Sequence, residues 1–342
     1  MLLDNRRLSV LTVLLVLASG LAVFFPMLGM AKYLLAGHLV WFRAEIRQLV
    51  LPFLMLVGWG GVVYSGWEGI KDVVFILCYV APFVFGRLIV TSKDLNYIFL
   101  ALIAVFIVTS IPALMSGFHM SLLGSESTLE SHTMAFVFGA FAVYYFGVRS
   151  YILFLIALVL VVLSLKRIAL LGIFVAILFM MLPFVFGRFL KYVALVVNLL
   201  YVVVCFYITS EDFNDFCMDY MEVSSAYFTQ GRSVLYSYVY DDVGLSFFGA
   251  GSGAVYGALW GTIADGKVLL HNDVLKIFME YGVIVFCLFW YAFYSVKSRL
   301  ALSIVVYLNV LFMTDNVLIY VFVMFFALLL MKVAEEEFPN EN

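Results

Sequence analysis

Charged residues are scarce in this chain, and their scarcity narrows its class. Asp, Glu, Lys and Arg make up 12% of the 342 residues, about half the share in a soluble domain, while 66% are apolar. A soluble enzyme, a disordered tail and a nucleic-acid-binding protein are therefore excluded. The polar–apolar alternation of strands in an outer-membrane barrel is also missing. The composition predicts an all-α polytopic membrane protein, and the net charge of −3 is too small to indicate a partner.

Cysteines at the spacing of a metal site or a disulfide are missing as well. Cys78, Cys205 and Cys287 lie in apolar runs, and Cys217 lies in a polar segment. No spacing among these four residues is typical of a zinc site or of a disulfide. We interpret all four as packing residues, and the sequence predicts no metal and no cofactor.

Long apolar runs separated by short polar breaks fill most of the chain. A hydrocarbon core about 30 Å thick needs about 20 helical residues. The runs lie at about 8–27, 28–42, 49–66, 70–90, 95–115, 132–148, 151–165, 168–186, 190–209, 273–296, 300–313 and 317–333. Lys32 and His38 interrupt the short second run, which is either a span or an interfacial segment. The sequence thus predicts about 11–12 transmembrane helices, the first of which is an uncleaved span rather than a signal peptide.

The distribution of Lys and Arg predicts the orientation of these spans. With a cytoplasmic N-terminus and twelve crossings, twelve of the nineteen Lys and Arg residues fall on the cytoplasmic side, where such residues are enriched. We therefore expect an N-terminal transmembrane bundle at 1–209, an outer loop at 210–270, C-terminal transmembrane helices at 271–334 and a cytoplasmic tail at 335–342. These parts form one integral membrane domain.

The outer loop is too long to be a simple connection. Segment 212–223 places apolar residues on one helical face and acids largely on the other, which predicts an amphipathic helix on the outer membrane surface. A second helix is expected at 232–242, followed by the glycine-rich run 249–253. That run is only a weak sign of a phosphate-binding loop, because the strand that should precede such a loop is not visible.

Seven of the nineteen Lys and Arg residues fall on the predicted outer side, and three of these seven are candidates for a site. Lys166 and Arg167 lie between two apolar spans, either as a snorkelling pair that marks a tight turn or as part of a site. Arg232 is one of two cations in a loop with eight acids. It either forms a salt bridge, for example with Asp241 or Asp242, or presents a fixed fork of donors to a phosphate.

His271 opens the span that follows the loop. Asn272 or Asp273 is a suitable N-cap for that helix, so His271 is expected at its mouth, facing outer water or a cavity. It is either an interfacial histidine bonded to a carbonyl group or a base that takes a proton from a hydroxyl group at neutral pH. Glu280 lies deeper in the same helix, and we expect it to pair with Lys276, four residues before it.

These motifs, in this order, resemble those of one bacterial superfamily. The matching residues are Ser164-x-x-Arg167, Gly231-Arg232, Gly249-x-Gly251, His271-Asn272 and Gly282. Over about 160–290 the chain looks like the O-antigen or capsule repeat-unit polymerases and the O-antigen ligases. It departs from their pattern at Val285, where the family has a second glycine, and Lys166 is particular to this chain.

The resemblance implies a fold, a reaction and a set of site residues. It implies a glycosyltransferase C-like helical fold in the bacterial inner membrane, with the outer loop and active site toward the periplasm. A hexosyltransferase-like, metal-independent and inverting enzyme would move a glycan from undecaprenyl diphosphate to an acceptor hydroxyl. By the resemblance, Arg167 and Arg232 would bind the diphosphate, and His271 with Arg232 would be catalytic; Lys166, beside Arg167, is a further candidate for the diphosphate. From the residues themselves, Tyr236, Tyr240 and Trp260 either stack on sugar rings or belong to an interfacial aromatic belt, and Asn272 is a further candidate sugar contact.

Three functions remain open from the sequence. The favoured one is a polymerase that transfers the growing chain onto a lipid-linked repeat unit, in lipopolysaccharide or other polysaccharide biosynthesis. A ligase that transfers the chain to lipid A core differs from it only in the acceptor. A transporter or flippase would show two related halves with interrupted helices, and no such repeat is visible. For the polymerase, the expected partners are the lipid-linked oligosaccharide, the bilayer, a chain-length regulator and a flippase, and no nucleic acid.

The predicted orientation can be tested by labelling single cysteines in an otherwise cysteine-free chain. An impermeant maleimide added to spheroplasts should label an Asp219→Cys variant directly, because residue 219 lies in the outer loop. It should label a Lys297→Cys variant only after permeabilisation. Labelling of residue 297 before permeabilisation would contradict the orientation.

Overall fold

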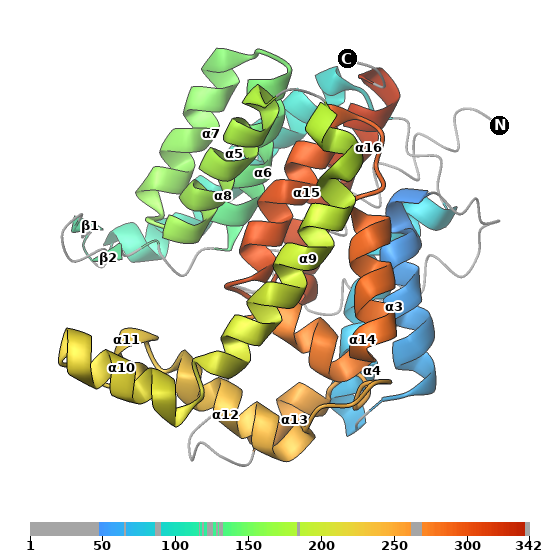
Figure 1. Cartoon of the computed structure of the whole chain (residues 1–342). Coiled ribbons are helices and arrows are strands. Elements are labelled where there is room, and N and C mark those ends of the chain that lie inside the picture. The colour runs from blue at the N-terminus through green and yellow to red at the C-terminus, as the bar shows by residue number, and fades with distance from the viewer. Residues whose placement is uncertain are drawn as a thin grey trace.

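The computed structural model shows a helical bundle with a set of short helices at one end (Figure 1). It describes residues 48–338 except 65, 86–89, 116, 118–119, 122–125, 128, 130–132, 183–184 and 261–268. The first two predicted runs, 8–27 and 28–42, lie outside the described residues. Within the described residues the only strands are β1 (Met120–Ser121) and β2 (Glu126–Ser127), an antiparallel pair of two residues each.

Apolar helices make up the bundle. They are α3 (Leu51–Val62), α4 (Gly66–Phe85), α5 (Ser92–Met115), α6 (Met134–Gly147), α7 (Tyr151–Leu163), α8 (Arg167–Met181), α9 (Val185–Tyr207), α14 (Asp273–Phe293), α15 (Arg299–Phe312) and α16 (Val321–Glu337). The 3-10 turns η3 (Gln48–Val50) and η4 (Val317–Ile319) precede α3 and α16. Each of these ten helices overlaps one of the predicted apolar runs.

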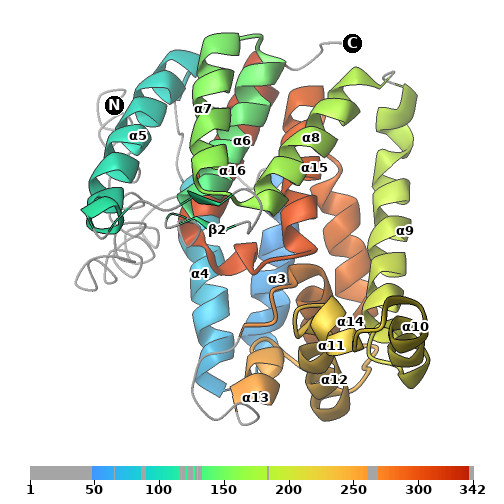
Figure 2. The same cartoon turned by 90° about the vertical axis from the view of Figure 1, so that its left-hand side faces the viewer.

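Three helices in the described part of the chain are long and apolar enough to cross a membrane. These stretches are Ser92–Pro112 in α5, Phe189–Tyr207 in α9 and Asp273–Phe293 in α14. The chain is therefore an α-helical membrane protein. Figure 2 shows α5 on one flank of the bundle and α9 on the other, which leaves one side of each helix open. On α9, exposed Val196, Leu200 and Val203 recur every three to four residues and form an outward apolar stripe.

The core of the bundle lies around α16, which is buried from Val321 to Ala334 and packs against α4, α6 and α15. Close packing here depends on small residues. The Tyr307 hydroxyl donates to the Phe136 carbonyl over 2.8 Å. A Cβ at Gly139 would lie within 2.1 Å of that hydroxyl, and one at Gly172 within 2.8 Å of the same ring. Glycines thus let the Tyr307 ring fit between α6 and α8.

Within its described residues, the loop predicted at 210–270 forms four helices. They are α10 (Glu211–Met221), α11 (Ser225–Phe228), α12 (Arg232–Val243) and α13 (Ala254–Trp260). Of these, α10 and α12 match the helices expected at 212–223 and 232–242, and the other two were not predicted. Ser210 caps α10 by accepting a hydrogen bond from the Phe213 N–H. The four helices lie together at one end of the bundle (Figures 1 and 2).

Helix α14 is broken at Gly282, whose φ of 76° and ψ of 174° are not helical. The break frees backbone groups, and the glycine-rich run satisfies them. The Ala250 and Gly251 N–H groups donate to the Met279 and Glu280 carbonyls at 3.0 and 2.9 Å, and the Val283 N–H donates to the Phe247 carbonyl. The run at 249–253 therefore docks the loop into α14, which gives this run a structural role that the sequence did not indicate.

The predicted pairing of Lys276 with Glu280 is wrong. Lys276 Nζ instead lies 2.5 Å from Asp72 Oδ2, because α4 brings an acid against this face of α14. Glu280 is fully buried, and its Oε1 accepts a hydrogen bond from the Val255 N–H at the start of α13. The carboxyl group thus stabilises the N-terminus of a neighbouring helix.

A Gly282→Ala substitution should destabilise the protein. A Cβ at this position would lie 2.4 Å from the Phe247 carbonyl oxygen and 2.5 Å from the Gly249 nitrogen, and alanine disfavours the positive φ. We expect the free energy of unfolding to fall by about 2–5 kcal/mol, because the left-handed backbone and the steric overlap both disfavour alanine. The midpoint of thermal unfolding in detergent measures it.

Gly257→Ala is the matched control. Gly257 lies on the exposed face of α13 with open space at its Cβ position, so alanine should leave the midpoint unchanged or raise it. Equal midpoints for the two variants would contradict the role of the break.

Candidate active site

Arg232 is presented by a turn of two left-handed residues. Gln230 (φ 55°) and Gly231 (φ 82°) lie in the turn between α11 and α12. Arg232 is the first residue of α12. The Ser233 N–H donates to the Thr229 hydroxyl over 3.0 Å and helps to hold this turn. The guanidinium Nη2 donates to the Thr314 carbonyl at 3.4 Å.

Arg232 forms no salt bridge with Asp241 or Asp242 in the described part of the structure. Its side chain instead reaches the segment between α15 and α16. The positive charge therefore lies at a helix N-terminus, where the helix dipole adds to it, and is not neutralised by an adjacent acid.

His271 reaches the same segment from the start of α14. Its φ of 52° places it in the left-handed region directly before the helix, as the sequence predicted. Its Nδ1 lies 3.5 Å from Asp315 Oδ1, and its side chain is 49% exposed. Because a carboxylate only accepts hydrogen bonds, Nδ1 is the donor in this contact, and in a neutral imidazole Nε2 is then the acceptor.

Asp315 is held firmly beneath His271. Its carboxylate accepts from the Asn316 N–H at 2.7 Å and from the Tyr320 hydroxyl at 3.3 Å. Burial acts to raise the pKa of Asp315, but the hydrogen bonds from His271 and Asn316 outweigh it and hold this pKa below its usual value. The charge of Lys166 acts in the same direction, so Lys166 lies within electrostatic range of this carboxylate.

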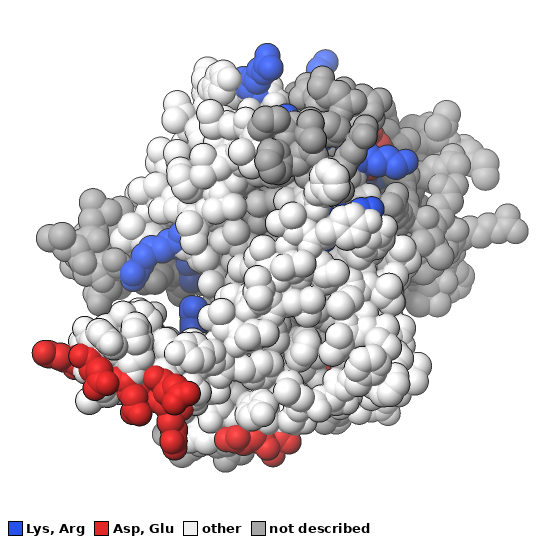
Figure 3. All heavy atoms as spheres, in the orientation of Figure 1, with Lys and Arg blue, Asp and Glu red and all other residues white. Residues whose placement is uncertain are grey.

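Lys166 and Arg167 lie where α7 turns into α8. The Lys166 ammonium lies 5.7 Å from the centre of the Phe136 ring, and exposed Arg167 is the first residue of α8. In Figure 3, basic residues line the upper rim of a hollow on this flank, and acidic residues lie further down, along the lower edge of the molecule over α10. The structure thus brings Arg232, His271 and Lys166 to the Thr314–Asp315 segment, with Arg167 adjacent in sequence but without a direct contact to them.

Asn272 fixes the two elements that carry Arg232 and His271. Its Oδ1 caps α14 by accepting from the Leu275 N–H at 2.9 Å, which confirms it as the N-cap. Its Nδ2 donates to the Tyr236 hydroxyl on α12 at 2.9 Å and contacts Tyr201 and Cys205 on α9 at 3.3 Å each. Asn272 is fully buried, so its role is to hold α12 and α14 in place rather than to contact a ligand.

The aromatic residues expected to bind sugars differ in exposure. Tyr236 is 3% exposed and offers no free ring face. Burial, the largest cause, raises the pKa of Tyr236 to about 12, so its hydroxyl stays protonated. Tyr240 is partly exposed and packs against Phe206, while Trp260 is 61% exposed and packs against Tyr256. Of these three residues, only Tyr240 and Trp260 can offer a ring to a sugar.

Asp315 is the residue that the sequence reasoning missed. A signal was present, because Thr314-Asp315-Asn316 is a polar break between two apolar runs, and the predicted topology places that break on the outer side with the loop. Among the described residues no three His, Cys, Asp or Glu side chains gather in a group that could hold a metal ion. The site therefore consists of cations around an imidazole that a carboxylate orients.

The arrangement meets the geometric requirements of a base with an orienting group. Asp315 contacts Nδ1 of the half-exposed imidazole, and the positive charges of Arg232 and Lys166 act on the same Thr314–Asp315 segment. Such a site can accept a proton from a hydroxyl group while the cations stabilise a departing anion.

Comparisons with known proteins leave the chain unassigned. No protein-family model, no curated protein and no solved structure matches it. The resemblance to O-antigen polymerases and ligases stays an expectation from the motifs.

An Asp315→Asn substitution should remove a pH-dependent part of the stability. Because the folded state lowers the pKa of Asp315, the carboxylate stabilises the fold above the ordinary Asp pKa of about 3.9 and loses this effect as the pH falls through the lower folded-state value. We expect the variant to be about 1–3 kcal/mol less stable near neutral pH. That difference should shrink below about pH 4.

Thermal unfolding in detergent over this pH range measures the difference. Asp212→Asn, on the exposed face of α10, serves as the control and should show no such trend. A constant difference between wild type and Asp315→Asn at all pH values would contradict the assignment.

Proposed function

We propose that this protein is a polytopic inner-membrane glycosyltransferase of the glycosyltransferase C-like class, which polymerises lipid-linked repeat units on the periplasmic side. The growing glycan would leave its undecaprenyl diphosphate and join a sugar hydroxyl of the incoming unit. The observation that carries the proposal is the His271–Asp315 pair beside Arg232, at the base of the long loop.

The positive charges suit a diphosphate leaving group. Arg232 and Arg167 are each the first residue of a helix, so the partial charge of the helix N-terminus adds to each guanidinium. Guanidinium groups bind two phosphate oxygens at once and stay charged at all relevant pH values. Lys166 adds a third cation near Asp315. These groups would stabilise the departing diphosphate without a metal ion.

His271 would act as the base in an inverting transfer. As the acceptor oxygen attacks the anomeric carbon, its proton moves to Nε2 of His271. The bond from the anomeric carbon to the diphosphate oxygen breaks, and the electron pair leaves with the diphosphate. Asp315 would hold the imidazole and stabilise the positive charge that it gains. The products are a glycan longer by one unit and a free lipid diphosphate.

Tyr240 and Trp260 are the side chains that best suit the sugar rings, since both are at least partly exposed on loop helices. Asn272 and Tyr236 would contribute by fixing α12 against α14. A chain-length regulator would control the length of the glycan, and a flippase would supply the lipid-linked substrate.

The test uses the purified full chain in vesicles with fluorescent undecaprenyl-diphosphate-linked single repeat units from its own host. Wild type should produce a ladder of products on the carrier lipid. His271→Ala and Arg232→Ala should each slow ladder formation on the order of a hundredfold or more, because each removes a group that acts in the transition state. Gel electrophoresis of samples taken at successive times gives the rate of ladder formation for each variant.

Lys297→Ala is the matched control, since it removes an exposed cation at the opposite end of the bundle and should leave the ladder unchanged. Full ladders from both site variants would refute the proposal. Transfer of label to added lipid A core, without a ladder, would identify a ligase. Movement of intact lipid across the vesicle membrane, without any new glycosidic bond, would identify a transporter.

A further inference from the structure

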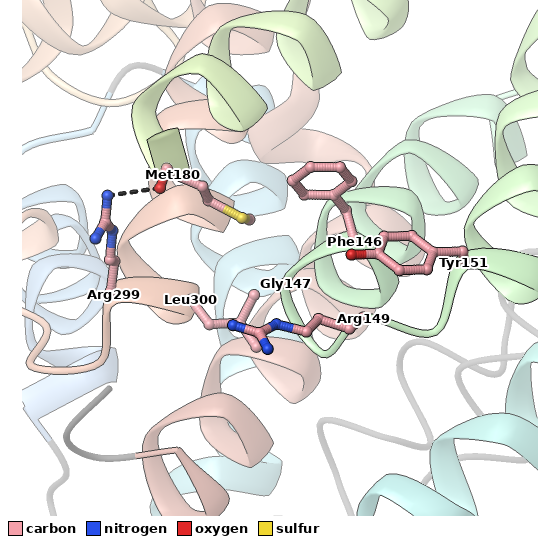
Figure 4. A pocket seen from close by; sticks show the side chains of 7 residues that line it. All are labelled: Phe146, Gly147, Arg149, Tyr151, Met180, Arg299 and Leu300. Carbon is pink, nitrogen blue, oxygen red and sulfur yellow. Dashed lines mark hydrogen bonds between the residues drawn. The ribbon is translucent and has the colours of Figure 1, made fainter. Parts of the chain in front are cut away.

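A second cationic hollow lies at the end of the bundle away from the loop helices. It has a volume of about 530 Å³ and is formed where α6 ends, α7 begins, α8 ends and α15 begins. Arg149, Tyr151, Met180 and Arg299 are among its lining residues. Figure 4 shows Arg149 extending from the α6–α7 turn toward Leu300, with Arg299 beside Met180 on the other wall. The proposed polymerase does not use this hollow.

Arg299 is fixed by the backbone of α8. Its Nη2 donates to the Met180 carbonyl at 2.6 Å, to the Phe179 carbonyl at 3.4 Å and also to the Leu182 carbonyl. These bonds satisfy carbonyl groups at the C-terminus of α8, and they hold the guanidinium in one orientation. The positive charge is therefore preorganised at the wall of the hollow.

Arg149 occupies a position that favours glycine. It follows the end of α6 with a φ of 59°, and the Ser150 N–H donates back to the Tyr145 carbonyl at 2.8 Å, the pattern of a Schellman motif. A non-glycine residue there costs about 1–2 kcal/mol. The turn aims an exposed guanidinium at the hollow in spite of this cost.

Among the residues that the structure describes, no acid lines the hollow. Glu335 lies near its edge, but it accepts hydrogen bonds from the N–H groups of Lys297 and Ser298. Among the described residues neither Arg149 nor Arg299 forms a salt bridge. Two guanidinium groups thus face one space without a carboxylate to neutralise them, which favours a phosphate group there.

The helices beside the hollow expose apolar side chains outward. Tyr151, Ile152 and Leu155 on α7 and Leu178 and Met181 on α8 are all exposed. In an α-helical membrane protein such faces contact acyl chains. A ligand with a phosphate group and apolar chains would match the hollow and both helices together, whereas a free phosphate would use only the arginines.

We infer that this hollow is a binding site for an anionic phospholipid. The phosphate of the head group lies between Arg149 and Arg299, and the acyl chains follow α7 and α8. Basic pockets between transmembrane helices at a membrane surface bind anionic head groups in this way. This inference does not depend on the proposed polymerase.

The test titrates the purified full chain in detergent with phosphatidylglycerol or phosphatidylcholine. Native mass spectrometry measures bound lipid, and thermal unfolding measures stabilisation. Wild type should retain phosphatidylglycerol in preference to phosphatidylcholine. Arg149→Gly should bind phosphatidylglycerol about tenfold more weakly or worse, the factor for one charge-assisted hydrogen bond. Its midpoint without lipid should not fall, because glycine suits the positive φ.

Lys297→Gln is the control for general surface charge. It removes one exposed cation two residues before Arg299 and should keep wild-type affinity. The inference is overturned if Lys297→Gln loses as much affinity for phosphatidylglycerol as Arg149→Gly does. Unchanged affinity in Arg149→Gly also overturns it. Equal stabilisation by inorganic phosphate alone also overturns it, in favour of a small-anion site.

Discussion

The candidate site depends on one buried carboxamide. Asn272 caps α14, and its amide nitrogen bonds to Tyr236 on α12 and contacts α9. Arg232 begins α12 and His271 precedes α14, so this single side chain sets the distance between a cation and an imidazole. An amide suits the role because it donates and accepts at once without carrying a charge into the bundle. Its burial raises the cost of breaking any of these bonds, which keeps the two helices in one relative position.

The other constraint is the break in α14, together with the partners that its Lys276 and Glu280 side chains find on neighbouring elements. Gly282 interrupts the helix, and the freed backbone groups bond to the run at 249–253. Lys276 pairs with Asp72, and Glu280 accepts from the start of α13. Irregular backbone is stable at membrane depth only where protein satisfies it. The loop helices are thus anchored into the bundle through α14 and hold a fixed place over the Thr314–Asp315 segment.

The sequence predicted the helices well and the contacts between them poorly. Apolar runs of the right length predict helices from local composition alone, and the cap at Asn272 follows from a short local pattern. Lys276 and Asp315 show the limit. Their partners, Asp72 and His271, are 204 and 44 residues away, and only the packing of helices brings them together. Lys276 was therefore paired with an acid one turn further along its own helix, and Asp315 was passed over because nothing in its own segment indicates a histidine.

The lengths of the helices have a consequence for the surrounding bilayer. Helix α7 has 13 residues and rises about 20 Å, roughly 10 Å less than a hydrocarbon core, whereas the 23 residues of α9 rise about 35 Å. A bilayer accommodates such hydrophobic mismatch by thinning locally, at a cost of fractions of a kcal/mol per Å. Were α7 to cross the bilayer, the membrane beside it would be thinner than beside α9, and the lipid phosphate groups at this flank would lie closer to the depth of Lys166 and Arg167.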